Sequence, residues 1–91
     1  MPEIHFTIQL PDGVRKTCYS PSSVVLKHFR ADQELTVAEF VRESRAALTE
    51  ASERVRRKFG FSCTAAAAQL DEIEHFTAAQ PADGIVRILS I

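Results

Sequence analysis

The chain begins with strict alternation of apolar and polar residues. The apolar positions are Ile4, Phe6, Ile8 and Leu10, and the polar positions between them are His5, Thr7 and Gln9. This alternation predicts a strand with one buried face. Pro11-Asp12-Gly13 then predicts a hairpin turn, because proline fits its first corner and glycine its left-handed position. The resulting register places Phe6 opposite Cys18, which puts Cys18 on the apolar face and Tyr19 on the other.

Helical spacing replaces alternation in the middle of the chain. Ser20-Pro21-Ser22-Ser23 is typical of a helix start and predicts a short helix through Val24 to Phe29. A polar connection follows, and then Thr36 and Glu39 form a capping box. Apolar residues recur at helical spacing from Val37 to Phe59, where Gly60 predicts the end of a long helix.

The last third of the chain predicts one more helix and one more strand. The expected inward face of that helix consists of Cys63, Ala66, Ala67, Leu70, Ile73 and Phe76. Residues 85–91 predict a closing strand, and apolar residues on both of its faces favour an inner position in the sheet. The order β-β-α-α-α-β predicts a single α+β domain over residues 1–91, with a small three-stranded sheet and helices packed on one face.

Composition and charge narrow the class of protein. The 91 residues are 45% hydrophobic and 25% charged, which is typical of an ordinary globular domain. The net charge of −1 is too small to produce a long-range electrostatic field that would attract a membrane. The start of the chain lacks the basic and apolar segments of a signal peptide, and two cysteines are too few for a secreted disulfide scaffold. We therefore expect a cytoplasmic protein without a membrane partner.

One basic cluster, Arg54-Val55-Arg56-Arg57-Lys58, raises the question of nucleic acid binding. Its charges surround the end of the long predicted helix, and Glu50 and Glu53 lie close enough to offset them. This pattern is typical of a solvated helix end, so nucleic acid is not expected as a partner.

Cys18 and Cys63 are the residues whose side chains offer the widest range of chemistry. Both are predicted to point inward, where packing as small hydrophobes is the favoured interpretation. A reversible disulfide would need their Cα atoms within about 7 Å. A metal site would need His5, His28 or His75 to complete the ligand set, and no histidine stands at a ligand spacing. A nucleophilic Cys63 would need a base that the sequence does not place. No catalytic residue, cofactor or metal is assigned.

The segment after the hairpin is a second candidate site. Tyr19, Ser20 and Ser22 could present hydroxyl and N–H groups to an anion or a partner. The simpler interpretation is that the serines only cap the short helix that follows.

Several ordered fragments carry a resemblance over essentially the whole chain. They are Pro2-Glu3-Ile4-His5-Phe6-Thr7, Pro11-Asp12-Gly13, Cys18-Tyr19-Ser20-Pro21-Ser22, Ala51-Ser52-Glu53-Arg54-Val55, Gly60-Phe61-Ser62-Cys63 and Ala66-Ala67-Ala68-Gln69-Leu70. Together they resemble a family of small bacterial nitrogen-starvation-response proteins. Such proteins are typically encoded beside a nitrilase, a radical-SAM enzyme, an acetyltransferase and a flavin-dependent oxidoreductase. The resemblance implies a role in using nitriles or cyanide as a nitrogen source, and it supplies no catalytic residues.

Three classes of function therefore stay open. The favoured one is a non-enzymatic accessory or regulatory protein that binds enzymes of a nitrilase-type gene cluster, with a homodimer as a further option. The alternative is a small thiol or metal-binding protein that uses Cys18 and Cys63. The third is a nucleic-acid binder that acts through residues 54–58.

Overall fold

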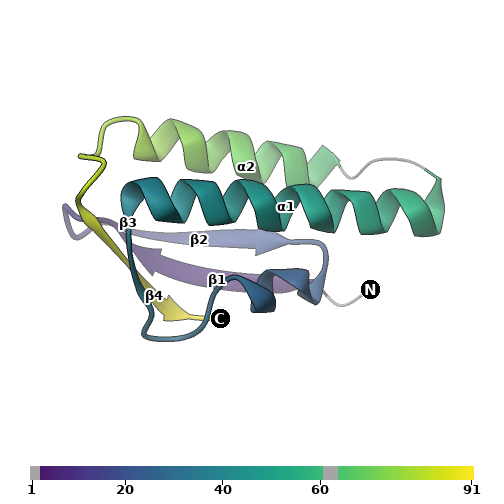
Figure 1. Ribbon diagram of the computed structural model, residues 1–91, viewed down its shortest axis with the longest axis horizontal. Coiled ribbons are helices and arrows are strands. Elements are labelled where there is room, and N and C mark those ends of the chain that lie inside the picture. The colour runs from purple at the N-terminus through teal and green to yellow at the C-terminus, as the bar shows by residue number, and fades with distance from the viewer. Residues whose placement is uncertain (1–2, 61–63) are drawn as a thin grey trace.

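The computed structural model describes residues 3–60 and 64–91, which form a four-stranded antiparallel sheet with two long helices on one face (Figure 1). The elements in chain order are β1 (Ile4–Gln9), β2 (Arg15–Ser20), the 3₁₀ helix η1 (Ser23–Lys27), β3 (Glu34–Thr36), α1 (Val37–Phe59), α2 (Thr64–Thr77) and β4 (Ile85–Ser90). The strand order is β2-β1-β4-β3. The predicted α+β class and the inner position of the closing strand are confirmed, whereas the sheet has one strand more than expected.

The β1–β2 hairpin forms in the predicted register. Phe6 lies opposite Cys18, and both side chains are buried at 1% exposure. The turn closes because Gly13 adopts a positive φ of 90° and donates its N–H to the carbonyl of Leu10 at 2.9 Å. The carboxylate of Asp12 accepts the N–H of Val14 at 3.0 Å.

The additional strand is β3, at the edge of the sheet opposite β2. Leu35 pairs with Val86, and the chain reaches this edge from β2 by way of η1. Sequence pattern does not reveal β3 because only Leu35 of its three residues is buried. The predicted short helix is present as a five-residue 3₁₀ helix, whose Val24 and Val25 are buried.

Helix α1 begins and ends where the sequence predicts. The Thr36 hydroxyl accepts the N–H of Glu39 at 3.1 Å, and the Glu39 carboxylate accepts the N–H of Thr36 at 3.0 Å. Both halves of the capping box are therefore present. At the other end, Gly60 has a φ of 81° and donates its N–H to the carbonyl of Arg56.

Helix α2 faces the core with most of the predicted side. Ala66 and Ile73 are buried, and Leu70 and Phe76 pack half-buried against the core. Ala67 is exposed instead of buried, and Gln69 and Thr77 join the buried side. The buried Gln69 has a partner there, because its side-chain oxygen accepts the N–H of Tyr19 in β2 at 2.9 Å. Cys63, the remaining residue of the predicted inward face, lies outside the described residues.

A register shift in β4 explains its apolar residues on both faces. Ile8 pairs with Ile88, but Thr7 pairs with Ser90, so Leu89 is an extra residue at a bulge. Before the bulge Val86 and Ile88 are fully buried; after it Ser90 is exposed and Ile91 packs against the core. Ile85, at the start of the strand, is 46% exposed.

In residues 3–60 and 64–91, no helix combines the length and the apolar character that crossing a membrane requires.

Candidate functional site

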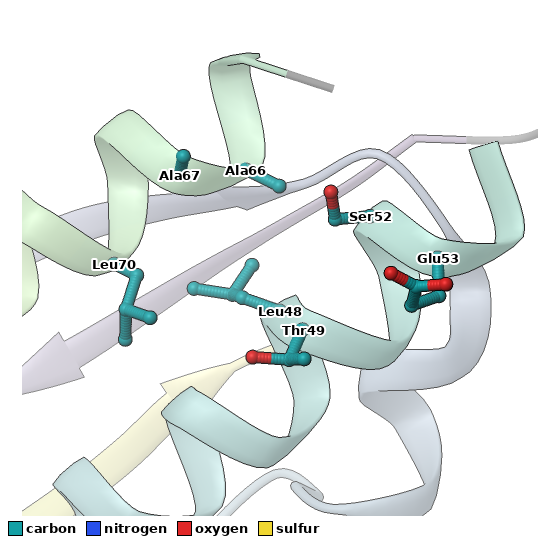
Figure 2. Close-up of a pocket in the computed structure, with 7 residues that line it drawn as sticks. All are labelled: Leu48, Thr49, Ser52, Glu53, Ala66, Ala67 and Leu70. Carbon is teal, nitrogen blue, oxygen red and sulfur yellow. The ribbon is translucent and has the colours of Figure 1, made fainter. Parts of the chain in front are cut away.

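The two long helices enclose a hollow of about 170 Å³ on their solvent side (Figure 2). Helix α1 contributes Leu48, Thr49, Ser52 and Glu53, and helix α2 contributes Ala66, Ala67 and Leu70. The hollow forms because the alanines of α2 are too short to fill the space beside the longer side chains of α1. We call it the α1–α2 groove.

The α1–α2 groove has an apolar floor and a polar rim. Leu48 and Ala66 are buried at 2% and 1% exposure, and Leu70 is half-buried against the core. On the side of α1, Figure 2 shows the hydroxyls of Thr49 and Ser52 and the carboxylate of Glu53. These groups can donate and accept hydrogen bonds at the rim of an otherwise apolar groove.

Ion pairs lie beside the groove on α1 and between the helices. Arg45 of α1 forms an ion pair with Glu74 of α2 at 3.1 Å. Arg45 lies one helical turn before Thr49 in α1, and Glu74 lies one turn after Leu70 in α2. Glu53 pairs with Arg56 at 3.6 Å, and its side chain keeps 47% exposure. Both pairs are exposed and contribute little to stability. The Glu53 carboxylate is therefore accessible to a cationic group of a partner.

Cys18 is an inert thiol in this structure. Its side chain lies in the core, and burial raises the pKa of Cys18 to about 12, with a further rise from Glu72 and a small opposing effect of Lys16. A thiol with such a pKa is protonated at neutral pH and is neither a good nucleophile nor a good metal ligand. Its burial fits the favoured interpretation of Cys18 as a small hydrophobe. Cys63 lies outside the described residues, so a disulfide or metal site shared by the two cysteines stays an untested alternative.

The histidines that could complete a metal site lie on different elements. His5 in β1 contacts the Tyr19 ring, His28 after η1 contacts Glu43 at 3.0 Å, and His75 lies in the last turn of α2. Among the described residues, no group of three or more His, Cys, Asp or Glu side chains could hold a metal ion.

The predicted site of Tyr19, Ser20 and Ser22 does not form one surface. Ser20 and Ser22 are buried, and the Ser20 hydroxyl donates to the carbonyl of Ser22 at 2.8 Å. The Ser22 hydroxyl accepts the N–H of Val24 and thereby caps η1. Tyr19 lies on the opposite face, with its ring centroid 5.6 Å from that of His5. The serine hydroxyls therefore serve the turn, and the contact of these residues with an anion or a partner stays a prediction.

Sequence pattern did not reveal the α1–α2 groove. Which alanines of α2 line a hollow depends on the rotation of α2, and that rotation depends on contacts between residues distant in sequence, such as the bond between Gln69 and Tyr19, fifty positions apart.

Comparison with known proteins places the chain in a family. No curated protein and no solved structure matches it significantly. The family model described as the nitrogen starvation-induced protein NitG matches residues 5–91, which include nearly all of β1 and every later element. The chain therefore belongs to the NitG family of nitrogen starvation-induced proteins.

Proposed function

We propose that this protein is a non-enzymatic accessory protein of the nitrogen-starvation response, and that its α1–α2 groove receives one apolar side chain of a partner protein. The size of the groove supports this proposal. Pockets for small-molecule substrates usually have volumes of about 300–1,000 Å³, whereas a cavity of about 150 Å³ holds a benzene-sized group. A groove of about 170 Å³ therefore suits one leucine or phenylalanine side chain.

The lining of the groove defines the chemistry of that partner. Leu48, Ala66 and Leu70 supply an apolar floor, which favours an apolar anchor. Thr49 and Ser52 can bond to polar groups of the partner backbone, and Glu53 suits a neighbouring lysine or arginine. We therefore expect a partner segment with an apolar residue followed closely by a basic one.

The gene neighbourhood that the resemblance implies suggests an enzyme to test as the partner. The resemblance described above implies such a neighbourhood, and we propose the nitrilase as the enzyme that is bound. The thiol or metal-binding alternative has less support, because Cys18 is buried and protonated.

The test uses two arginine substitutions on the exposed side of α2. Ala67→Arg places a long side chain in the groove, and Ala68→Arg adds the same charge to the next position, which does not line it. Binding of the purified protein to a nitrilase from the gene cluster that the resemblance implies is measured by isothermal titration calorimetry. Ala67→Arg should weaken binding at least tenfold, and Ala68→Arg should change it less than twofold.

Two results would overturn this proposal. One is the absence of binding to the nitrilase by the unmodified protein at micromolar concentrations. The other is an equal loss of binding in the two variants, because that would assign the effect to charge on α2 and not to occupation of the groove. Circular dichroism of both variants verifies that the helices are intact.

A further inference from the structure

The exposed side of η1 carries an apolar side chain next to a basic one. Leu26 is 50% exposed, although Val24 and Val25 before it are buried at 1% and 0%. The side chain of Lys27 is 60% exposed. Successive residues of a 3₁₀ helix are separated by about 120°, so two neighbours can both face solvent while the rest of the turn packs inward. The η1 segment therefore presents a leucine and a cation together.

The α1–α2 groove selects among the exposed apolar side chains of the chain itself. In residues 3–60 and 64–91 the large ones are Val14, Leu26, Phe59 and Ile85. The volume of the groove and the carboxylate of Glu53 favour a leucine or phenylalanine that is followed by a basic residue. Leu26, which is followed by Lys27, meets both conditions.

Each of the other three exposed side chains lacks one of these two properties. Val14 is smaller, and the side chain of Arg15 after it points to the opposite face of the hairpin. Ile85 is followed by an apolar residue and Phe59 by a glycine. The Nζ atom of Lys58 also lies 5.6 Å from the centroid of the Phe59 ring, so this ring already has a cation on one face. Leu26 is therefore the best match to the groove.

The η1 segment and helix α2 carry opposite charges. Residues 23–30 contain Lys27 and Arg30 and no acidic residue, whereas α2 contains three acidic residues and no lysine or arginine. The acidic residues near the η1 segment already have basic partners: Glu43, Glu50 and Asp32 form ion pairs with Arg42, Lys27 and Arg87. Arg30 is left without an ion pair in the described part of the chain.

Asp71 provides the matching negative charge beside the groove. It directly follows Leu70, is exposed, and forms no ion pair within residues 3–60 and 64–91. Lys27 can exchange Glu50 for Glu53 of another copy at little cost, because the Lys27–Glu50 pair joins side chains that are 60% and 44% exposed. A second copy whose η1 lies over the groove therefore brings positive charge to negative charge.

We propose that the α1–α2 groove binds Leu26 of a second copy of this chain. Lys27 of that copy then lies beside Glu53, and its Arg30 lies beside Asp71. This contact rests on the function proposed above, since it uses the same groove, and it adds what fills the groove when no partner enzyme is bound. Self-association then competes with partner binding and weakens it as the protein concentration rises.

The contact joins two different parts of the surface, because α1 lies between η1 and α2 (Figure 1). Such heterologous contacts add copies head to tail, in open chains or in rings. One half-exposed leucine and two exposed charge pairs form a small interface. The association is therefore weak and needs a high protein concentration.

Sedimentation velocity from about 10 to 500 µM tests the proposal, and the average mass of the unmodified protein should rise above that of the monomer. Leu26→Ser removes the inserted side chain, and Ala67→Arg fills the groove. Each substitution should weaken association at least tenfold. An equimolar mixture of the two variants should form a complex of two chains and nothing larger, because the groove of one and the leucine of the other make a single intact contact.

Matched control variants separate this contact from general effects on the surface. Val14→Ser removes another exposed apolar side chain, and Ala68→Arg adds a charge to α2 outside the groove. Both should change association less than twofold. Lys27→Glu should weaken it about threefold, and Lys58→Glu, the same change at the end of α1, should not. A monomeric unmodified protein at 500 µM would overturn the proposal, as would a monomeric mixture or an equal loss in Val14→Ser.

Nitrilase binding distinguishes this contact from the function proposed above. Leu26→Ser keeps the groove, so it should bind the nitrilase at least as tightly as the unmodified protein, whereas Ala67→Arg should lose both interactions. If the two variants complement each other and no nitrilase binds, the self-association holds and the proposed partner is wrong. If the nitrilase binds through the groove and the unmodified protein stays monomeric, the self-association alone is wrong.

Discussion

At the residue scale, the burial of Cys18 sets how the protein responds to alkaline pH. Burial raises the pKa of Cys18 from 9.0 to about 12, so the unfolded chain releases this proton at a lower pH than the folded protein. Stability from the protonated thiol is thus fully present below pH 9 and is lost as pH rises toward 12. By pH 10 the expected loss is about 1.4 kcal/mol.

Cys18→Ala isolates this effect from every other group that titrates. At pH 8 the variant should be less stable by about 1 kcal/mol, the usual cost of deleting one buried heavy atom. Urea unfolding at pH 8, 9 and 10 should show that this difference disappears by pH 10, because only the unmodified protein loses stability through Cys18. Parallel pH profiles of the two proteins would contradict this assignment.

At the element scale, the capping box of α1 stabilises the longest helix. Thr36→Ala should lower the free energy of unfolding by about 1 kcal/mol, since the N–H of Glu39 loses its acceptor. Thr49→Ala on the exposed surface of the same helix is the control and should change it by less than about 0.5 kcal/mol. Urea denaturation at pH 7 measures both, and equal effects would show that the cap contributes nothing.

Local signals explain which elements the sequence could predict. The turn glycine, Gly13, and the capping pair of Thr36 and Glu39 act within a few residues, and the hairpin and α1 have the predicted positions. Strand β3 depends on pairing with β4, which is distant in sequence and leaves no periodic signal in three residues. The α1–α2 groove likewise depends on a contact between Gln69 and Tyr19. The alternation in residues 4–10 predicts which face of β1 is buried, but which strands lie on either side of β1 depends on the strand order.

At the scale of the whole molecule, Gln69 also protects an edge of the sheet. Strand β2 is an edge strand, and an exposed edge can pair with a second copy of the chain. The Gln69 side-chain oxygen accepts a hydrogen bond from the N–H of Tyr19 at 2.9 Å, and α2 thereby covers the end of β2. The opposite edge, β3, is only three residues long and offers little to pair with.

Gln69→Ala should therefore increase self-association, because it removes the acceptor of the Tyr19 N–H and the side chain that covers the edge. Sedimentation velocity from about 20 to 400 µM should show a sedimentation coefficient that rises with concentration more steeply than in the unmodified protein. Ala68→Gly is the control. This substitution at an exposed position should destabilise α2 by about 1 kcal/mol without uncovering β2. Equal association in the two variants would assign the effect to a less stable helix, whereas association of Gln69→Ala alone identifies β2 as the edge that α2 covers.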